Sequence, residues 1–183
     1  MRAIHLMPVG APGLGEPAPE MELLDALAAA LARVFQVSCH VRPGVLDAGA
    51  THEPGRRQFH ATAILRAMIA LEPDPEVRLL GIAEFDLFVP VLTFVFGEAQ
   101  LRGNRGLVSL HRLREEFYGL PPNPELTAER LAKEALHELG HTFGLRHCPQ
   151  WECAMASSHT VERLDLKQAQ YCAACRQTLS GSV

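Results

Sequence analysis

The sequence predicts an α/β fold, in which crossover helices pack on a sheet that is largely parallel at its start. The first hundred residues alternate between short apolar runs and a segment whose leucines recur at helical spacing. Strands connected through helices in this order favour parallel pairing. A long helix and a cysteine-rich final quarter follow, and they predict a small additional lobe. With 183 residues, the chain is long enough for one domain with a sizeable core.

The expected strands are compact apolar runs separated by loops rich in proline and glycine. They lie at residues 3–9, 37–41, 77–82, 92–96 and 108–113. The first helix is expected at residues 20–35, where Leu24, Leu27 and Leu31 recur at helical spacing. A second helix is expected at residues 58–71, because the prolines that follow it stop a helix.

A third helix is expected at residues 127–143. The segment 119–124, GLPPNP, is a rigid connector that cannot continue a helix. Thr127 is the expected N-cap, and Glu129 in the first turn suits the positive end of the helix dipole. Gly144 is placed to end the helix. Beyond it, a short helix is expected within residues 161–170, and the tail 180–183 is expected to be frayed.

This third helix carries the pattern HExxHxxGxxH, formed by His137, Glu138, His141, Gly144 and His147. Histidines four residues apart lie about one turn apart on the same helix face and can bind one ion. A glycine allows the sharp turn that brings the third histidine back. Three imidazoles leave one position of a zinc ion open, so the pattern predicts a catalytic zinc, with Glu138 as general base toward water.

A shorter HExxH pattern also occurs on solvated helix faces, and the extension to Gly144 and His147 is what favours a metal site. The other six histidines show no ligand spacing, and surface or hydrogen-bonded core positions are expected for them: His5, His40, His52, His60, His111 and His159.

Four of the five cysteines crowd into the last quarter as C-x4-C and C-x2-C: Cys148, Cys153, Cys172 and Cys175. In a reducing compartment such pairs are more often metal ligands than disulfides, although a disulfide or a redox CxxC stays open. Cys39 lies in an apolar run and is expected to be an inert thiol in a buried strand.

The order of these motifs resembles one family. Cys148 directly follows His147, and then come Cys153-Ala154-Met155 and the CxxC pair. Together with residues 93–99 and 164–167, this arrangement is similar to the archaemetzincins, a group of metzincin zinc metallopeptidases. The resemblance implies a metzincin-like, twisted mixed sheet with an active-site helix and a small zinc-stapled C-terminal lobe.

The resemblance also implies roles for residues and cofactors. His137, His141 and His147 would bind the catalytic zinc, Glu138 would be the base, and Met155 would be the Met-turn residue beneath the metal. The four clustered cysteines would hold a structural zinc, which gives two zinc ions per chain. Four thiolates form a closed tetrahedral site, suited to a lobe with few apolar residues.

The expected organisation is a single metallopeptidase domain, residues 1–183. It divides into an N-terminal subdomain, 1–144, with the active-site helix, and a C-terminal subdomain, 145–183, with the four-cysteine site. An extended peptide substrate is expected to pair with an edge strand, for which residues 97–103 are the candidate, although they also suit a plain turn. Trp151 would either wall the cleft or pack the lobe.

Two functions compete. The first is a zinc-dependent peptidase, aminopeptidase or endopeptidase, acting on peptides or proteins; the second is a catalytically silent zinc protein that binds peptides or a partner through the same cleft. The intact Glu138 favours the first. The net charge of −4 and the lack of long Lys/Arg runs give no sign of nucleic acid or membrane partners. A cytoplasmic protein is expected, because the N-terminal apolar run is broken by Pro8 and Gly10 before it reaches signal-peptide length. A monomer is also expected.

Overall fold

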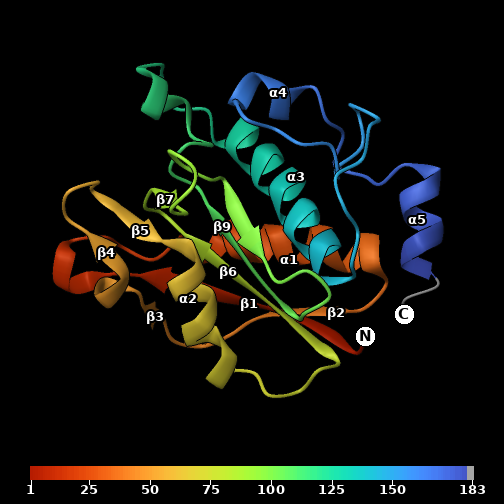
Figure 1. Cartoon of the computed structure of the whole chain (residues 1–183), viewed down its shortest axis with the longest axis horizontal. Helices are drawn as coiled ribbons and strands as arrows, with labels where there is room; N and C mark the ends of the chain where they lie inside the picture. The colour runs from red at the N-terminus through yellow and green to blue at the C-terminus, as the bar shows by residue number, and fades with distance from the viewer. Residues whose placement is uncertain (181–183) are drawn as a thin grey trace.

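A computed structural model describes residues 1–180 of the chain. Its main sheet has the strand order β2-β1-β6-β9-β8, and the short β3 pairs with the far end of β1 (Figure 1). All these pairs are parallel except β8 with β9, so the sheet is mixed. The strands are β1 (Ala3–Gly10), β2 (Ser38–Val41), β3 (Leu46–Asp47), β6 (Val77–Ala83), β8 (Gly97–Ala99) and β9 (Arg105–Ser109).

Helices cover both faces of this sheet. On one face lie α1 (Met21–Phe35) and α3 (Pro124–Thr142), and α2 (Ala61–Ala67) lies on the other (Figure 1). Alternate residues of each strand supply the two cores: Leu6 packs under α1 and α3, whereas Met7 packs toward α2. This alternation follows from the two-residue side-chain period of a strand. The expected α/β fold with a largely parallel first part is confirmed.

Shorter elements complete the chain. A second, three-stranded sheet has the order β4-β5-β7, with β4 (His52–Glu53), β5 (Gln58–His60) and β7 (Leu87–Phe88). The 3₁₀ turns in the described part of the chain are η1 (Pro12–Leu14), η2 (Gly49–Thr51), η3 (Met68–Ala70) and η4 (Glu115–Tyr118). After α3 come α4 (Val161–Asp165), which lies beside α3, and α5 (Ala173–Ser180). No helix within residues 1–180 is long and apolar enough to cross a membrane.

Several expected boundaries are wrong. Residues 92–96 form a loop joined to β7 by one bridge at Val95, and the strand comes just after it as β8. β9 ends at Ser109, so it overlaps only the first two residues of the strand expected at residues 108–113. α3 is capped by Asn123 rather than Thr127, because the Asn123 side chain accepts a hydrogen bond from the Leu126 N–H. Pro124 occupies the first helical position, where a backbone N–H would have no partner within the helix, so its lack of an N–H costs nothing. The last residue of the expected connector 119–124 therefore starts the helix.

The other differences concern burial and short elements. Residues 58–60 belong to β5 before α2 begins, α4 ends at Asp165, and α5 has no counterpart among the expected elements. β2 lies at the edge of the sheet with alternating exposed and half-buried residues, so it is not a buried strand. Cys39 is half-buried in it, and burial raises the pKa of its thiol to about 12. Of the expected frayed tail, residues 181–183 lie outside the described part of the chain.

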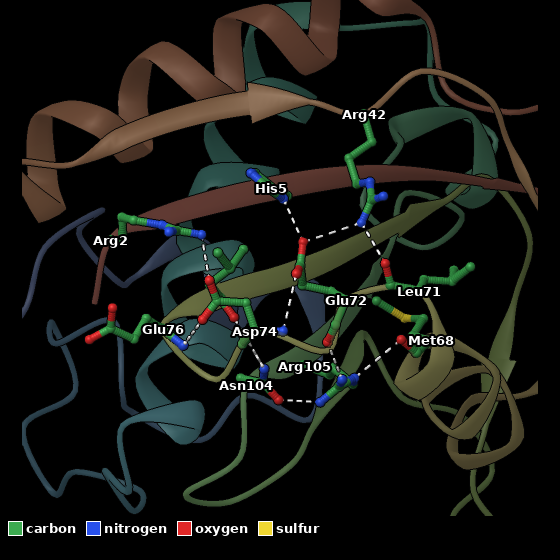
Figure 2. A network of polar contacts seen from close by, with 11 residues as sticks. Arg2, His5, Arg42, Met68, Leu71, Glu72, Asp74, Glu76, Asn104 and Arg105 are labelled. Atoms are coloured by element: carbon green, nitrogen blue, oxygen red, sulfur yellow. Dashed lines mark hydrogen bonds and ion pairs between the residues drawn. The ribbon is translucent and has the colours of Figure 1, made fainter.

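A polar network joins the segments that lead into β6 and β9 (Figure 2). The Arg105 guanidinium donates to the Met68, Ile69 and Glu72 carbonyl oxygens, which satisfies carbonyls left free where α2 and η3 end. The Glu72 carboxylate in turn lies 2.9 Å from His5 Nδ1 and 3.3 Å from Arg42 Nη1. These contacts fix the start of β9, and the chain continues from the other end of β9 through η4 to α3.

Candidate metal centre and cleft

The C-terminal half of α3 carries the histidine motif. Gly144 ends this segment with a φ of +90°, a conformation that residues with a Cβ rarely adopt. A Cβ there would also press on the Arg102 side chain. The chain therefore reverses immediately after the helix, and this reversal brings His147 back beside His137 and His141.

The three histidines converge on one point. Their nearest ring nitrogens all lie within 4.8 Å of one another. The Nδ1 atoms of His137 and His141 each lie 2.8 Å from a carbonyl oxygen, of Ala154 and Leu145 respectively. Because a carbonyl only accepts, both Nδ1 atoms carry the proton, and both Nε2 atoms present lone pairs.

These two Nε2 atoms lie 3.1 Å apart. Two lone pairs at that distance repel each other unless a cation lies between them. Zinc–nitrogen bonds of about 2.0–2.1 Å in tetrahedral geometry place ligand nitrogens about 3.3 Å apart. Burial lowers the pKa of all three histidines, and the Lys167 ammonium lowers it further. The rings are thus kept neutral and ready to bind a metal, so the residues fit a zinc ion.

Glu138 directly follows His137 on α3 and is buried, with 4% of its surface exposed. Burial, then the neighbouring Glu134 and Glu98 carboxylates, raise the pKa of Glu138 well above its usual value, and Lys167 opposes them. β8 passes close by, because a Cβ on Gly97 would overlap the Glu138 side chain at 2.7 Å. A glycine at position 97 is therefore what lets the edge strand approach this carboxylate.

Met155 lies beneath the helix with no exposed surface. It fits there because Gly140 has no side chain: a Cβ on Gly140 would overlap the Met155 sulfur and lie 3.3 Å from the Tyr171 ring. The Tyr171 hydroxyl donates to the Leu136 carbonyl at 2.6 Å. The segment after the histidines is thus packed directly against the turn of α3 that carries His137 and His141.

The four clustered cysteines also come together. The Sγ atoms of Cys148, Cys153, Cys172 and Cys175 lie within 4.8 Å of one another, and all four thiols are free. The Cys148 and Cys172 sulfurs are 3.8 Å apart. This matches the separation of about 3.8 Å expected for thiolates bonded to one tetrahedral zinc at 2.3 Å, and it excludes the disulfide of about 2.05 Å between this pair. Backbone hydrogen bonding from Cys175 lowers the pKa of Cys172 to about 7.

A cleft of about 730 Å³ opens over the three histidines. β8, the last strand of the sheet, forms one side of the cleft. The edge strand expected at residues 97–103 is limited to Gly97–Ala99, and the residues after it form a turn. The loop before β8 adds an apolar wall, where Val91 is 88% exposed. Trp151 is exposed and does not line the cleft.

Sequence reasoning missed a buried ion pair at the floor of this cleft. The Lys167 ammonium lies 3.2 Å from the Glu134 carboxylate, and their side chains are 1% and 4% exposed. Glu134 precedes Glu138 by one helical turn on the same face, a spacing that was visible in the sequence. Its lysine partner comes from beyond α4, and no sequence pattern connects the two.

Comparisons with known proteins agree with this geometry. Residues 60–181 match the model of Peptidase family M54. The chain is 41% identical to an archaemetzincin of Methanocaldococcus jannaschii over 158 residues, 86% of each chain. An archaemetzincin of Thermococcus kodakarensis is 43% identical over 129 residues, 70% of this chain and 69% of that protein.

Solved structures show the same fold. The crystal structure of the Archaeoglobus fulgidus archaemetzincin complexed with malonate has a TM-score of 0.80 at 31% identity, covering 96% of this chain and 99% of that one. A zinc-dependent peptidase from Methanocorpusculum labreanum has a TM-score of 0.82 at 26% identity, with the same coverage. The chain therefore belongs to the archaemetzincins, peptidase family M54, a family of zinc metallopeptidases.

Proposed function

We propose that this protein hydrolyses peptide bonds with a zinc ion held by His137, His141 and His147 and with Glu138 as general base. The observation that carries the proposal is the buried Glu138 carboxylate beside three neutral imidazoles that face one point in an open cleft. When bound, zinc supplies Lewis-acid chemistry and lowers the pKa of a coordinated water to about 7.

The protein's own groups supply the rest of the reaction. The Glu138 carboxylate accepts the proton of the attacking water and donates it to the leaving amine. Burial suits it to both steps, because a raised pKa makes the carboxylate a stronger base toward water than an exposed glutamate. The outward edge of β8 holds the peptide backbone extended across the histidines.

We further propose that the four cysteines hold a second, structural zinc, which makes two zinc ions per chain. The chain then divides at Gly144 into an N-terminal subdomain, 1–144, and a zinc-stapled subdomain, 145–183. The lobe has few large buried apolar residues, among them Val161, Leu164 and Tyr171, and these join the core beside α1 and α3, so a metal would hold the fold of the lobe itself. Met155 packs beneath the catalytic site and supports it structurally.

The test is turnover of an unbiased peptide library by zinc-loaded protein, compared with the Glu138→Ala variant. Loss of the general base is expected to lower the rate by about 10²–10⁴-fold. Zinc content is measured on both proteins, and the variant is expected to retain its metal, because Glu138 is not among the proposed ligands. Equal turnover by the two proteins would contradict the mechanism, and no turnover by either would favour a zinc protein that only binds peptides.

A further inference from the structure

The outward edge of β8 has a defined hydrogen-bonding pattern. The Ser109 N–H donates to the Phe96 carbonyl at 2.8 Å, and the Gln100 N–H donates to the Arg105 carbonyl at 2.9 Å. Bonded positions in an antiparallel pair recur every second residue, so Glu98 between them directs its backbone N–H and C=O toward β9. Glu98 is indeed the residue paired with Leu107 in the register of the two strands.

Gly97 and Ala99 consequently direct their backbone groups away from β9. No strand within residues 1–180 pairs with this side of β8, and the cleft lies there. A peptide that adds to the edge therefore bonds to Gly97 and Ala99, and the peptide residue between those bonds lies directly opposite Glu98.

The side chains of β8 alternate between two directions. The Cβ position of Gly97 points at Glu138, and so toward α3 and the metal centre. The Glu98 side chain therefore points to the other face, where the Thr62 hydroxyl lies 2.8 and 2.9 Å from its two carboxylate oxygens. This hydroxyl, on α2, holds the carboxylate in one orientation, and both residues line the cleft.

The Glu98 carboxylate has no cationic partner in the described part of the chain. None of the ion pairs formed by residues 1–180 includes it, although it is only half exposed. A single hydroxyl leaves most of the acceptor capacity of a carboxylate free. A half-buried anion held in place without a counter-charge favours a cationic ligand.

We propose that Glu98 is a specificity-determining residue that selects a cationic group in the substrate at the position opposite it. This inference rests on the proposed peptide-binding role of the cleft. The cation is an ammonium or guanidinium group, from a Lys or Arg side chain or from a free peptide N-terminus. Residues directly opposite on neighbouring strands have Cβ atoms about 4.5–5.5 Å apart, within reach of an ion pair. The apolar wall at Val91 and Leu92 suits the aliphatic stem of a long cationic side chain.

The experiment compares peptides that differ only in charge at one position. Acetylated and amidated peptides carry lysine or its neutral isostere norleucine at each position in turn, and the cleaved bond is identified by mass spectrometry. At one position relative to that bond, lysine is expected to raise kcat/KM about fivefold over norleucine, and the preference is expected to weaken at high salt. A second series with free N-termini separates the two sources of the cation.

The Glu98→Gln variant keeps the size of the side chain and an oxygen for Thr62 but removes the charge, so the ratio of lysine to norleucine is expected to fall to about one. Glu22→Gln removes the same charge from an exposed position on α1 and is expected to leave the ratio unchanged. A ratio that stays the same in Glu98→Gln, or no position that prefers a cation, would overturn the proposal.

The same peptides are also titrated into zinc-loaded Glu138→Gln protein, so that binding is measured without turnover. A lysine preference in binding that disappears in the Glu98→Gln/Glu138→Gln double variant supports the role of Glu98 even where the wild type cleaves nothing. That result would remove the proposed peptidase function while the inference about Glu98 stands. Equal affinities for lysine and norleucine peptides, together with equal affinities for free and acetylated N-termini, would remove the inference and leave the peptidase function untouched.

Discussion

Replacing Gly140 with alanine tests whether the metal-binding helix depends on close packing against Met155. At an exposed helical position, alanine is more favourable than glycine by about 1 kcal/mol. Here the new Cβ would overlap the Met155 sulfur and lie 3.2 Å from the Met155 methyl carbon. Ordinary carbon contacts are about 3.5–4.0 Å, so the buried methionine would have to retreat by more than about 1 Å.

Overpacking of this kind costs about 1–3 kcal/mol, which exceeds the gain in helix propensity, so we expect a net loss of about 1–2 kcal/mol in the free energy of unfolding. Zinc affinity is expected to fall as well. The residue before Met155 is Ala154, whose carbonyl orients the His137 ring, and it moves with the methionine.

The assay is urea denaturation with zinc present at a fixed free concentration, arranged as a double-mutant cycle with Met155→Ala. Met155→Ala alone is expected to cost about 2–5 kcal/mol, because it leaves a cavity under the helix. In that background Gly140→Ala fills part of the cavity and is expected to be neutral or stabilising, which gives a coupling energy of about 1–3 kcal/mol. Equal effects of Gly140→Ala in the two backgrounds would refute the packing argument.

Two further predictions concern the C-terminal half of the chain. The Cys172→Ser/Cys175→Ser variant is expected to bind one zinc ion instead of two and to unfold at a lower temperature, measured by metal analysis and calorimetry; retention of two zinc ions would contradict the four-thiolate assignment. Lys167→Met leaves Glu134 buried without its partner and is expected to cost about 3–5 kcal/mol at neutral pH. Burial raises the pKa of Glu134, and removal of the ammonium raises it further, so this loss should grow as pH rises through the raised pKa that Glu134 has in the native wild type. It should shrink in acid, where Glu134 is protonated in both proteins. Urea denaturation of the wild type and of Lys167→Met at a series of pH values measures this loss of stability. A loss that does not depend on pH would contradict the reasoning.

The regular elements of the fold were predictable where a strong pattern met a strong stop signal. The helix at α1 and the strand at β6 were found almost to the residue, because leucine spacing and a continuous apolar run are local properties. The apolar run at residues 92–96 led to a wrong strand prediction, because a local pattern does not show how a segment packs. It is apolar, but in the tertiary structure it forms the wall of the cleft instead of a strand.

The sequence by itself predicted the candidate metal ligands. The three histidines stand at spacings that follow from the helix turn, the four cysteines form two closely spaced pairs, and the structure brings each set together. Helical periodicity and ligand spacing act over a few residues, so they can be recognised in the order of the letters.

Only the tertiary structure decided what surrounds that chemistry. Lys167 meets Glu134 from 33 positions away, and Glu98 meets Thr62 across 36. Gly97 and Gly140 matter because of what approaches them from another element, which no local pattern records. These contacts depend on how β8, α2 and the C-terminal lobe pack against α3. Packing is a property of the whole chain, and so the sequence indicated the candidate metal ligands while the packed fold specified the cleft.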